Sequence, residues 1–176
     1  MRGAPALVLL CGCRGLLGID GVSNPPPPDT GTSIDMAGDP GGDGPAMLGC
    51  PGDFVNIPGA GAHLYKLLIA ADDWSMQVEN CELVGNNVYL AIPDDLAELS
   101  GIHSLTTAAF WIGIDDLAME NTFVTVKGAA AMFLPWAGNQ PNDLNNQDCV
   151  AVLNGGLNFD DQRCADAQAA VCECEP

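Results

Sequence analysis

The sequence predicts an α+β domain that begins near residue 50 and is held together by disulfides. Short apolar runs typical of strands are mixed with two segments of helical spacing, and one long loop-rich region carries the polar residues. A hydrophobic content of 48% with three tryptophans supports a packed core. The chain has eight cysteines, and six of them lie in this domain: Cys50, Cys81, Cys149, Cys164, Cys172 and Cys174. An even six suggests three disulfides and an oxidising compartment.

The first half of the domain is expected to contain two strands and two helices. In order, these elements are strand 65–69, helix 74–83, strand 87–92 and helix 93–99. Asp72 or Asp73 can cap the first helix, because either side chain accepts hydrogen bonds from free backbone N–H groups. Gly85 ends this helix, and Pro93 suits the first turn of the second one.

The second half is expected to be a set of strands joined by loops. The strands are predicted over 110–114, 122–127, 150–153 and 169–173. Trp74, Trp111 and Trp136 are expected in the core. His63 and His103 are expected at the surface or at strand edges rather than as metal ligands.

The N-terminal segment has the features of an export signal. Arg2 followed by a short apolar run and small residues is typical of a secretory signal, and the run is too short to span a membrane. The sequence 10–13 resembles a bacterial lipobox, which implies a signal peptide over 1–12 and a lipid on Cys13. Removal of Cys11 and acylation of Cys13 would leave six cysteines to pair. An ordinary cleaved signal peptide is the alternative.

Residues 13–49 are expected to form a tether between the N-terminus and the domain. Four consecutive prolines at 25–28 favour polyproline II, and residues 38–45 are rich in Gly, Asp and Pro without an apolar period. Such a segment would hold the domain off a surface.

Charge excludes one large class of partners. Five basic residues face 23 acidic ones, which gives a formal charge of −18. This surface repels phosphate backbones and anionic lipid, so nucleic-acid binding is not expected and cations are the natural partners.

The most distinctive stretch runs from Trp136 to Cys149 and is followed by Asp160, Asp161 and Cys164. Its amides and carboxylates lie near two cysteines that can bridge, which is how a small secreted domain builds a calcium site from loops. Zinc held by cysteines is disfavoured, because the chain contains no Cys-x2-Cys pair and both histidines lie far from the cysteines in sequence.

Several of these elements occur together in a familiar order. They are Cys81 on the first helix, Trp111-Ile-Gly-Ile, Trp136, Gln140-Pro-Asn142, Gln147-Asp-Cys149, Phe159-Asp-Asp161, Cys164 and Cys172-Glu173. Over about residues 50–174 the chain thus resembles a C-type lectin-like domain. The resemblance implies an α+β fold with two short helices, small antiparallel sheets and a long calcium-binding loop region. It also implies the disulfides Cys81–Cys172 and Cys149–Cys164, which leave Cys50 and Cys174 for each other.

The resemblance implies two sets of calcium ligands. The set that also binds sugar corresponds to Gln140, Asn142, Gln147, Asp160 and Asp161, of which the first four would contact the carbohydrate. An auxiliary set corresponds to Asp116, Glu120, Asp143 and Asp148. Two positions of the sugar site that carry Glu in calcium-binding relatives carry Gln here, so we expect weak affinity, about 10⁻⁴ to 10⁻³ M. When the side-chain oxygens of Gln140 and Asn142 bind calcium, each amide has only its NH2 group, a donor, left for the sugar. One sugar hydroxyl then lacks an acceptor, which costs about 1–3 kcal/mol of binding free energy if it is buried.

Two functions remain open at the level of the sequence. The first is a calcium-dependent carbohydrate-binding module that is secreted or displayed on the outer cell surface and binds a glycan or glycoprotein. The second is a protein-recognition, adhesion or structural domain in which calcium only orders the long loop. An enzyme is not expected, because the chain contains no Gly-x-Ser-x-Gly, His-Glu-x-x-His or phosphate-loop motif, and the paired aspartates are better explained as metal ligands than as glycosidase acids.

Overall fold

The computed structural model of the protein describes residues 49–176. The expected signal peptide, the lipidation site at Cys13 and nearly all of the tether lie outside the described residues. In chain order the elements are β1 (Leu64–Asp72), α1 (Trp74–Val84), β2 (Val88–Leu90), α2 (Leu96–His103), β3 (Phe110–Asp115), β4 (Val124–Thr125), β5 (Cys149–Val152), β6 (Phe159–Gln162) and β7 (Gln168–Cys174). This mixture confirms the predicted α+β class.

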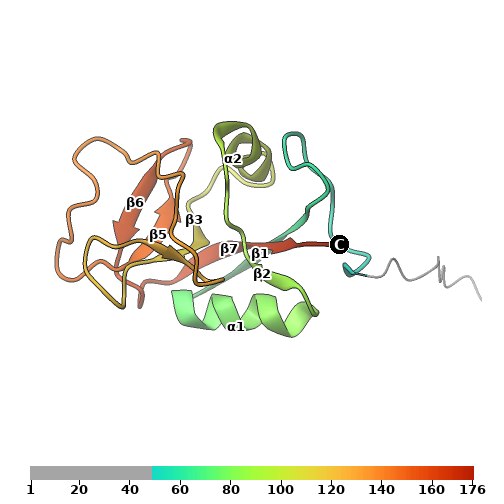
Figure 1. Ribbon diagram of the computed structural model, residues 1–176, viewed down its shortest axis with the longest axis horizontal. Helices are drawn as coiled ribbons and strands as arrows, with labels where there is room; N and C mark the ends of the chain where they lie inside the picture. The colour runs from blue at the N-terminus through green and yellow to red at the C-terminus, as the bar shows by residue number, and fades with distance from the viewer. Residues whose placement is uncertain (1–48) are drawn as a thin grey trace, which may run out of the picture. The chain divides into compact units, whose positions relative to one another are not determined.

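The strands are joined into one hydrogen-bonded sheet. β1, β7, β3, β5 and β6 are neighbours in that order, while β2 also pairs with β7 and β4 with β3. All pairs are antiparallel except β3 with β7, which run parallel and connect the two antiparallel groups. Figure 1 shows β7 between α1 on one side and α2 on the other.

Side-chain alternation along the central strands builds a core on each face of the sheet. In β3, Trp111 joins one cluster and Ile112 the other. α1 adds Trp74 to the cluster of Trp111, and α2 adds Leu99 to the cluster of Ile112. The indole N–H of Trp74 donates to the carbonyl of Ile112 at 2.8 Å, so its polar group is satisfied within the core.

Both helices begin at an aspartate cap. Asp73 accepts from the N–H of Met76 at 2.9 Å, as one of the two predicted caps. The prediction for the second helix was wrong at both ends. Asp95 accepts from the N–H groups of Ala97 and Glu98, so α2 begins at Leu96 and Pro93 lies before it. α2 also continues past residue 99 to His103.

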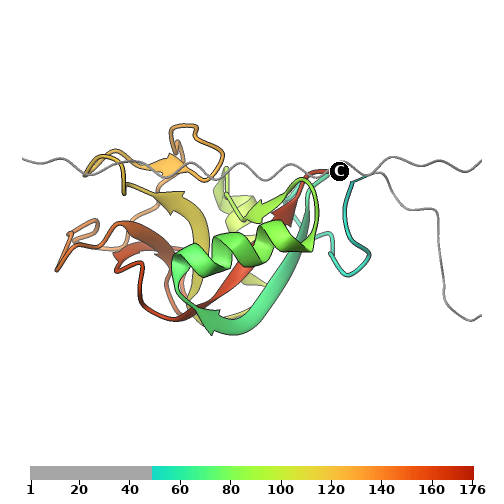
Figure 2. The same cartoon turned by 90° about the horizontal axis from the view of Figure 1, so that it is seen from below.

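Three disulfides fix the ends of this architecture. The pairs are Cys50–Cys174, Cys81–Cys172 and Cys149–Cys164, which confirms the predicted pairing. The first pair brings the start of the described chain beside its C-terminus (Figures 1 and 2). The second ties α1 to β7, across which α1 lies in Figure 2.

Most predicted strands are present with slightly different bounds, but β6 was not assigned from the sequence. It contains Asp160 and Asp161, and aspartate is rare in strands because it packs poorly on a pleated surface. Neither helix of the described chain has the length and apolar character needed to cross a membrane.

Candidate functional site

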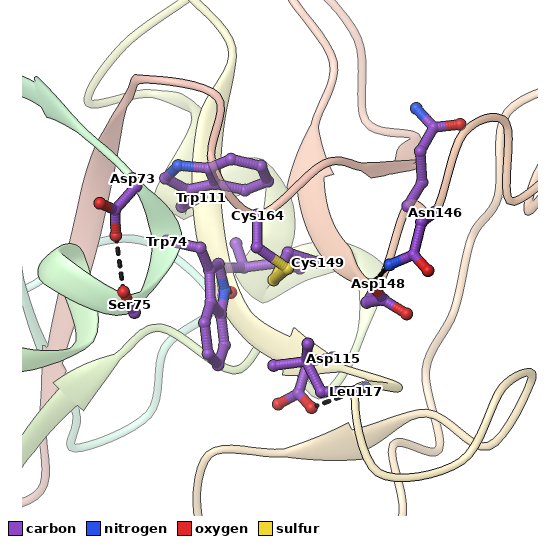
Figure 3. Close-up of a disulfide and its surroundings, with 12 residues drawn as sticks. Asp73, Trp74, Ser75, Trp111, Asp115, Leu117, Asn146, Asp148, Cys149 and Cys164 are labelled. Carbon is purple, nitrogen blue, oxygen red and sulfur yellow. Dashed lines mark hydrogen bonds between the residues drawn. A yellow bond between two sulfur atoms is a disulfide. The ribbon is translucent and has the colours of Figure 1, made fainter.

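A long loop between β4 and β5 carries most of the predicted ligands. The described residues 126–148 contain no helix or strand, so other contacts must position them. The N–H of Asp116, just after β3, donates to the carbonyl of Asp148 at 3.0 Å. The Cys149–Cys164 disulfide follows directly and lies beside Trp74 and Trp111 in Figure 3. The loop therefore ends on a rigid, buried framework.

Trp136 fixes the other side of the loop. Its ring centroid lies 4.8 Å from that of Phe123 and 6.2 Å from that of Phe159, in tilted and edge-on arrangements. Its backbone forms a bridge to Phe159 in β6. The ring is half-buried against the core, while Trp74 and Trp111 are buried, in agreement with the expectation for all three tryptophans.

Asp161 anchors the tip of the loop. This β6 side chain is only 1% exposed. Its carboxylate accepts from the N–H of Asn142 at 3.0 and 2.9 Å and from the N–H of Asp143 at 2.6 Å. The Gln140–Pro141 peptide bond directly before this contact is cis. The sequence marked Asp161 as a metal ligand, and the structure adds that it holds the backbone of the sugar-site loop.

The amides of the sugar-site set contact one another and the loop backbone. The Asn142 amide donates to the Gln140 side-chain oxygen. Asn142 Oδ1 and Gln147 Oε1 both accept from the N–H of Leu144, at 2.9 and 2.8 Å. The N–H of Gln147 donates to Asp143 at 2.8 Å. The structure thus brings Gln140, Asn142 and Gln147 together around the anchored tip, with their oxygens engaged inside the loop.

Asp160 lies differently. Successive strand residues face opposite sides of a sheet, so Asp160 points away from the side on which Asp161 meets the loop. Its Oδ2 accepts from the Gln162 amide at 2.9 Å. Its Oδ1 is buried and has no hydrogen-bond partner among the described residues.

Four carboxylates gather at the auxiliary site. Asp116 is 1% exposed, and its Oδ2 accepts from the N–H of Asn121 at 2.7 Å. Burial raises the pKa of Asp116 to about 6, and the negative charges of Glu120 and Asp148 add to the rise. Its Oδ1 is a second buried oxygen without a partner in the described part of the chain.

The remaining members of this set are close enough to repel one another. Partial desolvation raises the pKa of the exposed Glu120, and the charges of Asp143 and Asp148 raise it further. Burial likewise raises the pKa of Asp115, which is not a member of the set but precedes Asp116, and the charge of Asp148 contributes to this rise. The Asp148 carboxylate also accepts from the Asn146 amide. The site is therefore short of positive charge.

The donors of both sets fit calcium. Calcium takes six to eight oxygens from carboxylates, amides and backbone carbonyls. The auxiliary set offers four carboxylates, including the unpartnered buried oxygen of Asp116. The sugar-site set offers the carboxylate of Asp161 and three amide oxygens that already accept hydrogen bonds in the loop. Both sets therefore match calcium in donor type and fit it after a local rearrangement, because among the described residues no three of the auxiliary carboxylates have oxygens within 4.8 Å of one another.

Comparison with known proteins places this geometry in a family. Residues 70–174, more than half of the chain, match the family model described as "Lectin C-type domain". The chain belongs to the C-type lectin family. Membership in this family of non-enzymatic lectins confirms that the protein is not an enzyme.

Individual relatives and structures of the C-type lectin family support the assignment. The chain is 36% identical over 75 residues to the α-N-acetylgalactosamine-specific lectin of Patiria pectinifera, which covers 41% of this chain and less than half (45%) of that lectin. The mouse scavenger receptor C-type lectin carbohydrate-recognition domain matches with a TM-score of 0.64 at 20% identity, covering 71% of this chain and 97% of that domain. A calcium-independent type II antifreeze protein matches with a TM-score of 0.63 at 22% identity, covering 70% and 92%. At these identities the two structures show the shared fold.

Sequence reasoning about this C-type lectin domain missed several residues that shape the loop. Asn121 and Asn146 have positive φ values of 61° and 65° and contact Asp116 and Asp148. Asparagine tolerates this backbone conformation better than most residues. The asparagines next to predicted ligands were the available signal for these turns.

Proposed function

We propose that this chain is a calcium-dependent carbohydrate-binding module that is secreted or displayed on the outer cell surface. The observation that carries the proposal is the buried, unpartnered oxygen of Asp116 among the negative charges of Glu120 and Asp148, with Asp143 close to Glu120, beside a loop anchored on Asp161. Three disulfides suit an extracellular location. A lipid on Cys13 is the proposed anchor for surface display.

Two calcium positions are proposed, with different roles. An auxiliary calcium ion, held by Asp116, Glu120, Asp143 and Asp148, would neutralise these carboxylates. It would also fix the long β4–β5 loop to the segment that follows β3. A second ion, held by Asp161 and the amides of Gln140, Asn142 and Gln147, would supply the positive charge that sugar hydroxyls coordinate. Asp160 would join this set only if its carboxylate left the Gln162 amide and turned toward the loop. Asp161 already holds the loop backbone in this arrangement, so a ligand set forms if the amide side chains rotate.

The second candidate function is protein recognition, adhesion or a structural role, with calcium only ordering the loop. The observation in its favour is that the oxygens of Gln140, Asn142 and Gln147 all accept hydrogen bonds within the loop. An amide that turned its oxygen toward a metal and lost such a contact would forgo about 1 kcal/mol for each one. The fold also occurs in a calcium-independent antifreeze protein.

A glycan array, run once with calcium and once with a chelator, separates the two functions. The variant Asp161→Asn removes the ligand charge but keeps an acceptor for the loop N–H groups. Asn154→Asp, in the exposed β5–β6 turn, serves as a charge-changing control. Sugar binding that is lost with the chelator and in D161N, but retained in N154D, supports the first function. Absence of glycan binding together with stabilisation by calcium supports the second.

A further inference from the structure

A second cluster of metal-binding side chains lies away from the long loop. It consists of His63, Glu173 and Glu175, at the C-terminal end of β7 near the C mark in Figure 1. One donor atom of each residue lies within 4.8 Å of those of the other two. The proposed calcium sites use none of these residues.

The sheet register explains why these residues meet. Glu173 and Glu175 are two positions apart, so they share one face of the strand while Cys174 between them turns to its disulfide with Cys50. β1 pairs with β7 so that Leu64 lies opposite Cys174. One further step of this antiparallel register puts His63 opposite Glu175.

The contact between His63 and Glu173 has an unusual geometry. Nδ1 of the imidazole lies 2.6 Å from Oε1 of Glu173, yet this buried nitrogen has no hydrogen bond to any described residue. Two ligands of a tetrahedral zinc ion lie about 3.3 Å apart and are directed at the metal rather than at each other. A shift of less than about 1 Å converts the observed pair into such a ligand pair.

Glu173 is held in place by groups outside the cluster. The side chain is 2% exposed, and its Oε2 accepts from the N–H of Ile92 at 2.9 Å. Its Oε1 accepts from the Tyr89 hydroxyl at 3.1 Å. Partners of this kind orient metal ligands in protein sites. The glutamate therefore needs little reorganisation to bind an ion.

The charges around the cluster favour a cation. Glu98 is buried, and its Oε1 lies 3.9 Å from His63 Nδ1. Burial raises the pKa of Glu173 to about 6, and the charge of Glu98 adds to this rise. Lys127 contacts Glu175 at 2.7 Å, but both side chains are 43% exposed, so this pair is weak and solvent-screened. A buried carboxylate without full compensation is costly, and a divalent ion would provide that compensation.

We propose that His63, Glu173 and Glu175 form a transition-metal site selective for zinc over calcium. An imidazole nitrogen with two carboxylates is a zinc ligand set, whereas calcium prefers oxygens alone and more of them. The three residues line a pocket of about 270 Å³, which gives the ion an entry path and leaves room for water as fourth ligand. His63 thereby gains a role that the sequence did not predict. Bound zinc would clamp the segment before β1 to the end of β7, beside the Cys50–Cys174 disulfide.

This site can be tested by titrating zinc into the full chain in a large excess of calcium, after bound metals have been removed with a chelator and the chelator has been removed in turn. Calcium occupies the oxygen-only sites, so calorimetry should detect one zinc ion per chain. His63→Gln and Glu175→Gln should each weaken zinc binding by about tenfold or more. The chain has two histidines, so His103→Gln is the matched control and should bind as the wild type. A C11S/C13S variant, in which both cysteines of the N-terminal segment are replaced, should also bind zinc normally.

Cobalt substitution supplies a readout that is independent of affinity. A four-coordinate cobalt ion should give strong visible absorption in the wild type and in H103Q, but not in H63Q. Far-UV circular dichroism checks that H63Q is folded, as expected for a side chain that is 32% exposed. The proposal is overturned if excess calcium abolishes zinc binding, if H63Q binds zinc like the wild type, or if binding is lost only in C11S/C13S.

Discussion

Replacement of Asp116 by asparagine should stabilise the metal-free protein and weaken its response to calcium. Asp116 is 1% exposed, one of its oxygens has no partner among the described residues, and Glu120 and Asp148 add negative charge nearby. A rise of its pKa from 3.8 to about 6 means that folding disfavours the ionised form at neutral pH. This penalty is about 2–3 kcal/mol at 1.36 kcal/mol per pKa unit. An amide carries no such penalty, and its NH2 can donate to the neighbouring carboxylates.

Urea unfolding at pH 7, with chelator and with calcium, measures both effects of D116N. In chelator the variant should be about 1–3 kcal/mol more stable than the wild type. At calcium about 100 times above the dissociation constant, the wild type should gain about 2.7 kcal/mol. D116N should gain half of this or less, because affinity rises with ligand charge. Asp166→Asn removes a charge from the exposed pair with Arg163 and should change either stability by less than about 0.5 kcal/mol. A D116N variant that is less stable in chelator, or that keeps the full calcium response, would refute the reasoning.

Three other changes test separate parts of the structure. Gln147→Glu adds a carboxylate to the sugar-site set, so its calcium affinity measured by calorimetry should rise about tenfold, whereas that of N154D should not. Equal calcium affinities of Q147E and the wild type would contradict the assignment of Gln147. Replacing Cys149 and Cys164 by alanine opens a link between residues 15 positions apart, so unfolding in chelator should show a loss of about 3 kcal/mol, and an unchanged midpoint would argue against a structural role. Gly113→Ala puts a Cβ 2.4 Å from the Leu90 carbonyl and should cost about 1–3 kcal/mol, while Gly138→Ala, with no atom within 4 Å, should be nearly neutral; similar stabilities would refute this packing argument.

Strong local patterns predicted much of the fold. The span of α1, the buried run of β3 and the pairing of the cysteines were predicted correctly, because periodicity and disulfide pairing are properties of the sequence and the family. The start of α2 was misplaced, because Pro93 suits a first helical turn while the cap is decided by which aspartate reaches the free N–H groups. β6 was missed because two of its four residues are aspartates, which are rare in strands. Its pairing with β5 is what makes this segment a strand.

The candidate site was predictable in composition but not in its hydrogen bonding. The sequence named Asp161 and the amides as ligands, yet it did not show that Asp161 accepts backbone N–H groups of the loop. The contact between His63 and Glu173 was not predicted either, since it depends on the register between β1 and β7. Contacts between residues far apart in the chain require the sheet geometry that only the structure supplies.

Amide NMR of the labelled protein, titrated first with calcium and then with a monosaccharide glycoside, tests calcium-dependent sugar binding most directly. We predict that calcium shifts the signals of Asp116, Asn121, Asp143 and Asp148, and that the sugar then shifts those between Gln140 and Gln147. With chelator, the same sugar should shift none of these signals. Sugar-induced shifts that persist in chelator, or calcium-induced shifts confined to residues outside the β3–β4 turn, the loop and β6, would contradict the account.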